Sequence, residues 1–146
     1  MLPDNSLKKV FVSGCYDILH GGHIRFFQQA RRLWDHLTVC FASEQVLWLA
    51  KNRKPSLPDE HKKIVLSELR CVDRVVSSSD LDPVLDFVTH IDTLKPDILV
   101  VTEDDKNTEI KREFCQEKGI EFIVLAKDFF GTPTSTTAII HGIKYQ

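Results

Sequence analysis

The most informative part of the chain is VFVSGCYDILHGGH, residues 10–23. It begins as an apolar run suited to a buried strand and breaks at Gly14. Two histidines, His20 and His23, then stand around two glycines just before a helical pattern. Glycine lets main-chain N–H groups approach a ligand closely, and a helix start favours negative charge. We therefore expect a phosphate site here, with both imidazoles donating hydrogen bonds to a phosphoryl group.

Patterns typical of strands and of helices alternate along the rest of the chain. Apolar runs typical of strands cover residues 8–13, 36–42, 72–76, 97–102 and 121–125. Segments typical of helices cover residues 22–34, 59–69, 83–94, 108–118 and 135–143. Such alternation implies right-handed crossovers and a parallel sheet with helices on both faces. The sequence therefore predicts an α/β fold, a Rossmann-like three-layer α/β/α arrangement with a parallel five-stranded sheet. Ligands of such sheets bind beyond the carboxyl ends of the strands.

The composition is that of an ordinary globular protein, with 146 residues, 42% hydrophobic and 27% charged, and a formal net charge of -2. No repeat or linker-like tract divides the chain, so we expect one domain over residues 1–146. The near-neutral net charge argues against nucleic-acid partners, because proteins that bind nucleic acids usually carry a strong basic excess. The polar N-terminus lacks the apolar centre of a signal peptide, and no apolar run approaches the roughly 20 residues that span a bilayer. We expect a cytoplasmic protein with no membrane partner.

The four cysteines are far apart and form neither a C-x-x-C pair nor a Cys/His cluster at zinc spacing. They are Cys15, Cys40, Cys71 and Cys115. We expect free thiols in a reducing compartment and no structural metal site.

Residues 14–23 resemble the G-x-F-D-x-x-H-x-G-H signature of the nucleotidyltransferase superfamily, which shares a HIGH-type motif with class I aminoacyl-tRNA synthetases. The matching positions are Gly14, Tyr16 in place of Phe, Asp17, His20, Gly22 and His23. Three later segments resemble the same group, in the same order. They are KNRKPSLPDEHKK at 51–63, similar to archaeal FAD synthetases and bacterial heptose 1-phosphate adenylyltransferases, RCVDRV at 70–75, similar to glycerol-3-phosphate cytidylyltransferases, and TSTTAII at 134–140, similar to the terminal helix of all of them.

The resemblance implies transfer of a nucleoside monophosphate from a nucleoside triphosphate to a phosphomonoester, with release of pyrophosphate. It also implies a homodimer and Mg²⁺ bound mainly through the triphosphate. Direct attack on the α-phosphorus needs no covalent protein intermediate, so catalysis reduces to positioning and charge stabilisation. The resemblance assigns catalysis to His20 and His23, which would hold the α-phosphate, and to Lys51, which would bridge the phosphates of both reactants.

The resemblance also implies which residues contact the two substrates. Those expected at the nucleotide are Ser13, Gly14, Cys15, Tyr16, His20, Gly22, His23, Arg53, Asp104, Ser135, Thr136 and Thr137. Those expected at the acceptor substrate are Asp17, Lys51 and Arg70. Three of these assignments have a structural alternative. Asp17 follows a turn, where an aspartate often only fixes its own loop. Arg70 stands at the end of a predicted helix, where an arginine is often simply solvated, and serine and threonine, as at residues 135–137, favour helix caps.

Two departures from the resemblance bear on the nucleotide. Thr102 and Glu103 stand before Asp104, where most relatives have a glycine that lets the backbone approach the nucleotide. Residues 127–137, KDFFGTPTSTT, are longer than the R-T-E-G-I-S-T segment of cytidylyltransferases and lack its arginine and glutamate. We therefore favour ATP over CTP, with Phe129 and Phe130 either stacking on the base or packing.

Other interpretations remain open at this point. The chain could be a cytidylyltransferase acting on a polyol or sugar phosphate, or a nucleotide-binding regulatory module that has lost turnover, as the departure at residues 102–103 would suggest. The apolar run at residues 46–49 is either a packing or dimer surface or an apolar wall for a substrate.

Lys51, Arg53 and Lys54 are expected on one loop after the second strand.

Overall fold

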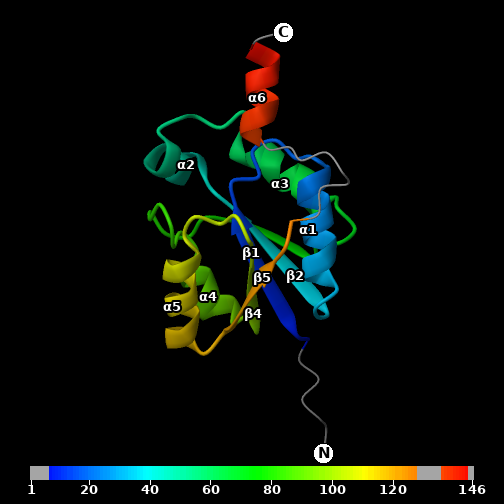
Figure 1. Ribbon diagram of the computed structural model, residues 1–146, viewed down its shortest axis with the longest axis vertical. Coiled ribbons are helices and arrows are strands. Elements are labelled where there is room, and N and C mark those ends of the chain that lie inside the picture. The colour runs from blue at the N-terminus through cyan, green and yellow to red at the C-terminus, as the bar shows by residue number, and fades with distance from the viewer. Residues whose placement is uncertain (1–6, 128–135, 145–146) are drawn as a thin grey trace, which may run out of the picture.

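The structure, a computed structural model, describes residues 7–127 and 136–144, with only the backbone described for Thr136, Thr137 and Lys144. Its elements are β1 (Lys9–Gly14), α1 (Gly21–Arg31), β2 (His36–Phe41), α2 (Glu44–Lys51), α3 (Asp59–Ser67), β3 (Arg74–Ser77), α4 (Val88–Leu94), β4 (Ile98–Thr102), α5 (Thr108–Lys118), β5 (Glu121–Leu125) and α6 (Thr136–Lys144). All five strands pair in parallel in the order β3-β2-β1-β4-β5. The predicted Rossmann-like α/β fold is confirmed (Figure 1).

The alternation of side chains along β1 explains the three layers. Val10 and Val12 point to one face of the sheet, where they share a buried cluster with Phe27 of α1. Phe11, between them, points to the other face and packs against Phe87 with ring centroids 5.6 Å apart. Because every second residue is buried on each face, both faces need a helical cover. Helices α1 and α3 cover one face, and α4 and α5 cover the other (Figure 1).

One predicted helix is wrong over its first half. The helix expected over residues 83–94 begins only at Val88. The carboxylate of Asp82 accepts hydrogen bonds from the backbone N–H groups of Val84 and Leu85, at 2.8 and 2.7 Å. This Asx-type turn offers those N–H groups an acceptor that a helix would not, so the backbone stays irregular up to α4.

Helix α2 was not among the predicted helices, and it changes the expected place of Lys51. Ser43 caps its start by accepting a hydrogen bond from the N–H of Val46 at 3.3 Å. Asn52 ends the helix in the left-handed conformation, with φ 50°. Lys51 is therefore the last residue of α2 and not part of a loop, whereas Arg53 and Lys54 do lie in the loop that follows. The strand expected at residues 72–76 is likewise shifted, to β3.

The strand order places a topological switch point at the carboxyl end of β1. The chain goes from β1 outward through β2 to β3, and then crosses to β4 on the other side of β1. The loops that leave β1 and β4 therefore diverge there, and a crevice at such a point is the usual ligand site in open α/β sheets. In the part of the chain that is described, no helix is both long and apolar enough to span a membrane. The four cysteines are free.

Candidate active site

The two histidines form a reciprocal cap at the start of α1. His20 is the N-cap residue, and its Nδ1 accepts a hydrogen bond from the N–H of Gly22 at 3.1 Å. Nδ1 of His23 accepts one from the N–H of His20 at 3.3 Å. This is the geometry of a capping box, with imidazoles in place of the usual hydroxyl and carboxylate. The backbone thus fixes both rings, whose centroids lie 3.9 Å apart.

The cap also decides which ring nitrogen of each histidine carries the proton. A nitrogen that accepts a hydrogen bond is unprotonated, so a neutral imidazole in this arrangement carries its hydrogen on Nε2. Burial, then the charge of Lys127, lowers the pKa of His20. Burial, then His20 and Lys127, lowers the pKa of His23 to about 4. At neutral pH the pair therefore offers two Nε2–H donors with no net charge.

We expect His23 to titrate with a midpoint near 4 in the nucleotide-free protein, instead of at its ordinary 6.5. A protonated ring could not accept the hydrogen bond from the N–H of His20, and it would bring a charge into a desolvated place. Proton NMR of the ring Cε1–H signal, assigned with a His23→Gln variant, measures the midpoint. A midpoint near 6.5 would contradict the described cap.

The absence of a side chain at Gly22 makes space for the imidazole ring of His20. A Cβ at this position would lie 2.9 Å from Cε1 and 3.0 Å from Nδ1 of the His20 ring. We expect Gly22→Ala to displace the ring and to lower turnover by about 10- to 100-fold, because small misplacements at a reacting centre are costly. Gly142→Ala, where no atom lies within 4 Å of the added Cβ, is the matched control. Equal turnover in both variants, measured alongside melting temperature, would show that the position of His20 does not matter.

Tyr16 lies beneath the histidine pair and not at its surface. Its backbone takes the left-handed conformation, with φ 46°, and its side chain is buried. The ring packs edge-on against His23 and Phe27, with centroids 5.5 and 5.0 Å away. A Cβ on Gly14 would lie 2.8 Å from the Tyr16 ring, so glycine is needed there. The structure thus gives the Tyr16 side chain a place supporting His23 instead of one open to a nucleotide.

Asp17 is fully buried, and its carboxylate is engaged by the chain itself. It accepts hydrogen bonds from the N–H groups of Ser56 and Leu57, at 2.7 and 3.2 Å, and from the guanidinium of Arg53 at 2.8 Å. Nζ of Lys62 lies 3.7 Å from it. Of the two roles predicted for Asp17, this geometry supports the fixing of a loop, and it leaves no carboxylate surface for an acceptor substrate. Arg53, expected at the nucleotide, is committed to Asp17.

Lys62 is the buried cation behind this loop. Its Nζ donates hydrogen bonds to the carbonyls of Cys15 and Ala42, at 3.2 and 3.5 Å. Burial lowers the pKa of Lys62, with Asp17 acting in the opposite direction. Burial by itself would raise the pKa of Asp17, but the hydrogen bonds from Arg53 and the backbone, and the charge of Lys62, bring it below its ordinary value. Lys62 therefore ties the ends of β1 and β2 to α3.

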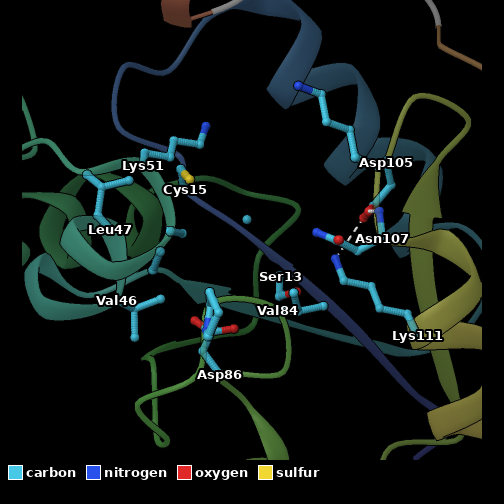
Figure 2. A pocket seen from close by; sticks show the side chains of 15 residues that line it. Ser13, Cys15, Val46, Leu47, Lys51, Val84, Asp86, Asp105, Asn107 and Lys111 are labelled. Carbon is cyan, nitrogen blue, oxygen red and sulfur yellow. Dashed lines mark hydrogen bonds and ion pairs between the residues drawn. The ribbon is translucent and has the colours of Figure 1, made fainter.

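A cavity of about 720 Å³ opens at the switch point. Lys51 and Cys15 lie on one side of it and Asp105, Asn107 and Lys111 on the other (Figure 2). Three of the expected nucleotide contacts, Ser13, Gly14 and Cys15, line it together with Lys51. The apolar run in α2 splits between two environments. Val46 and Leu47 line the cavity, whereas Trp48 and Leu49 are exposed.

Four charged residues that line the cavity were not predicted from the sequence: Asp86, Asp105, Lys106 and Lys111. Asp86 is buried, accepts a hydrogen bond from the hydroxyl of Ser78, and has its pKa raised, chiefly by burial. Lys111, also buried, pairs with Asp105 at 2.7 Å. The available signals were an acid within the half-apolar stretch LDPVLDF and a lysine within a helical segment at a position facing the sheet.

Residues 102–104, which include the departure from the family pattern, are bonded to Lys127, just after the end of β5. The hydroxyl of Thr102 donates to Asp104 at 2.6 Å, and the carboxylate of Glu103 accepts from the N–H of Lys127 at 3.1 Å. Nζ of Lys127 pairs with Asp104 at 2.5 Å. Burial by itself would raise the pKa of Asp104, but Lys127 and Thr102 bring it below its ordinary value. The departure at residues 102–103 thus has a structural role.

The remaining expected residues lie elsewhere or outside the described chain. Arg70 is exposed in the turn before β3, at the amino ends of the strands, so the structure does not bring it to the cavity. The backbone of Thr136 and Thr137 opens α6. Ser135, Phe129 and Phe130 lie outside the described residues.

Comparison with known proteins assigns the family. The family model described as "Cytidylyltransferase-like" matches residues 11–142. The bifunctional protein HldE of Helicobacter pylori (strain G27) is 37% identical over 145 residues, which cover 98% of this chain and 29% of HldE, so the chain spans less than a third of that relative. The FAD synthase of Ferroglobus placidus is 32% identical over 116 residues, covering 79% of this chain and 72% of the synthase. A crystal structure titled as the lipopolysaccharide core biosynthesis protein from Thermoplasma volcanium GSS1 superposes with a TM-score of 0.73 at 25% identity, covering 85% of this chain and 100% of that one. The protein therefore belongs to the cytidylyltransferase-like family of nucleotidyltransferases.

Proposed function

We propose that the protein transfers a nucleoside monophosphate, AMP in preference to CMP, from a nucleoside triphosphate to a small phosphomonoester and releases pyrophosphate. The observation that carries this proposal is the pair of neutral imidazoles fixed at the start of α1, directly after β1. The cavity with Lys51 opens at the carboxyl end of the same strand, and neither imidazole is among the residues that line it. The relatives HldE and FAD synthase support the same class of reaction.

The reaction needs one bond made and one broken at the α-phosphorus. An oxygen of the acceptor phosphate attacks it, and the bond to the bridging oxygen of pyrophosphate breaks. The Nε2–H groups of His20 and His23 would donate to the oxygens that gain charge, and the ammonium of Lys51 would hold the two phosphates together. No side chain changes its covalent state, so the work of the protein is to position both reactants and to offset charge.

Mg²⁺ would reach the site with the triphosphate, and would neutralise charge on the β- and γ-phosphates. Mg²⁺ commonly keeps several waters and takes one or two carboxylates together with substrate phosphates. Among the described residues no group of three His, Cys, Asp or Glu side chains gathers for a metal, and the triphosphate itself would hold most of the ion. We further propose a homodimer, for which the exposed Trp48 and Leu49 of α2 offer apolar area.

A pyrophosphate-release screen tests this function. Each of ATP, CTP, GTP and UTP is combined with sugar 1-phosphates, glycerol 3-phosphate and FMN in the presence of Mg²⁺. We expect release only when a nucleotide and an acceptor are both present, and more with ATP than with CTP. Nucleotide binding without release for any pair would favour a regulatory module, and higher rates with CTP would favour a cytidylyltransferase.

Lys51→Ala is expected to lower kcat by about 10²-fold and to change the Kd of the nucleotide by less than about 3-fold. The reason is that Lys51, at the cavity, would act between two phosphates that approach each other only as the bond forms. Steady-state kinetics and calorimetric titration with ATP and Mg²⁺ separate the two quantities. Lys63→Ala, on the exposed side of α3, is the control. Equal losses in kcat and affinity would instead indicate ordinary ground-state binding.

A further inference from the structure

We propose that the cavity selects an acceptor rich in hydroxyl groups, a sugar or polyol phosphate, and that Asp86 is the residue that reads those hydroxyls. This inference rests on the proposed function, because it takes the cavity with Lys51 as the place of the acceptor. It goes further by naming the chemical class of that acceptor and the side chain that recognises it.

The lining of the cavity argues against a flat aromatic acceptor. Its apolar wall consists of small and branched aliphatic side chains, Val46, Leu47 and Val84 among them. None of the described residues that line it is aromatic. A flavin ring would have to leave water without a stacking partner there, although stacking and edge-to-face contacts are what such rings gain most from in proteins. FMN, the substrate implied by the name FAD synthase, therefore fits this lining poorly.

Asp86 is held in a fixed orientation toward the cavity. Its carboxylate accepts from the hydroxyl of Ser78, and that oxygen in turn accepts from the N–H of Ser43 at 2.9 Å. The carbonyl of Asp86 accepts from the N–H groups of Ser79 and Asp80, at 2.8 and 3.0 Å, which anchors the backbone. A carboxylate offers about four acceptor positions, so further ones are left for ligand hydroxyls.

The opposite side of the cavity presents both donors and acceptors. Lys111 and Asp105 form an ion pair, and Asp105 also accepts from the N–H of Asn107 at 2.8 Å (Figure 2). Hydroxyl groups both donate and accept, so they can satisfy an acidic group and an ammonium in the same space. An acceptor without hydroxyls would exclude water from Asp86 and offer no donor to its remaining acceptor positions, which is how a polar site rejects the wrong substrate.

The test measures kcat/KM by pyrophosphate release for three kinds of acceptor. Hexose 1-phosphates and a heptose 1-phosphate supply hydroxyls, n-butyl phosphate has none, and FMN is planar and aromatic. We expect the best sugar phosphate to exceed both others by at least about 10²-fold. Asp86→Asn is expected to lower kcat/KM for that sugar phosphate by about 10- to 100-fold, and to leave kcat/KM for n-butyl phosphate within about 3-fold. Asp82→Asn, which keeps the oxygen that accepts from Val84 and Leu85, is the matched control.

The outcomes separate this inference from the proposed function. Release that is equal or greater with FMN or n-butyl phosphate overturns the inference and leaves the transferase reaction standing, and so does an Asp86→Asn variant that keeps the sugar preference. The wild-type panel decides the acceptor class even if Asp86→Asn fails to fold. If no acceptor gives pyrophosphate, the proposed function fails. Saturation-transfer NMR of the same acceptors then decides the inference by whether the hydroxyl-rich ones bind and whether Asp86→Asn abolishes that binding.

Discussion

Replacement of His23 or His20 with alanine is expected to lower the rate of nucleotidyl transfer by roughly 10²- to 10³-fold, the usual cost of removing one donor to a developing oxyanion. The two effects should not add fully, because each ring depends on the other. Nδ1 of His23 accepts from the N–H of His20, and the rings lie against one another. Turnover at saturating ATP and acceptor, measured by pyrophosphate release, checks the prediction.

A second substitution at the same position separates catalysis from folding. His20→Ala also removes the N-cap of α1, which costs about 1 kcal/mol of stability. His20→Asn retains a good cap residue but lacks the Nε2–H donor, so we expect it to keep the melting temperature and still lose activity. His61→Ala, on the exposed side of α3, should leave the rate unchanged. A folded His20→Asn protein with normal turnover would remove His20 from the mechanism.

Asp17→Ala is expected to lower the free energy of unfolding by about 3–5 kcal/mol, a large fraction of the stability of a domain of this size. The substitution leaves the ammonium of Lys62 fully buried without its carboxylate, and frees the N–H groups of Ser56 and Leu57. Urea unfolding at neutral pH measures the loss. A double variant with Lys62→Met should recover much of it, since the unpaired charge is then gone. A loss below about 1 kcal/mol would show that this network is not what holds the loop.

The same carboxylate gives the protein an acid-sensitive element. Arg53, the backbone N–H groups and Lys62 outweigh the effect of burial and hold the pKa of Asp17 below its ordinary 3.8. A lowered pKa stabilises the folded state above the unfolded value, and this contribution disappears as the pH falls through the folded value. The difference in stability between the wild type and Asp17→Ala should therefore shrink below about pH 4.

Most of the fold is predictable because parallel strands buried on both faces read as continuous apolar runs. The segments around Val12, Val39 and Val100 show this directly, and each is a strand of the observed sheet. The predicted start of α4 was wrong for a local reason, since the carboxylate of Asp82 binds backbone N–H groups that a helix would use. Helix α2 was missed because its short apolar sequence suits packing or a loop wall equally well.

The candidate site divides into a part that a local motif can predict and a part that only the topology assembles. His20, Gly22 and His23 are neighbours in sequence, so their joint place at a helix start follows from the motif. Asp86 and Lys111 come from segments 25 residues apart, and they share the cavity because β1 lies between β2 and β4 in the sheet. The pairing of Arg53 with Asp17 is likewise a tertiary contact that sequence spacing cannot give.

The central claim is that the two imidazoles serve a transfer between an α-phosphate and an acceptor phosphate. Phosphorus NMR of a reaction with ATP, Mg²⁺ and a sugar 1-phosphate follows that transfer directly. We expect the acceptor signal to be replaced by the coupled pair of a diphosphate diester, with one equivalent of pyrophosphate, and a conversion roughly 10²- to 10³-fold slower with the His20→Asn protein. Orthophosphate as the product, or unchanged spectra across all acceptors although ATP is bound, would contradict the account.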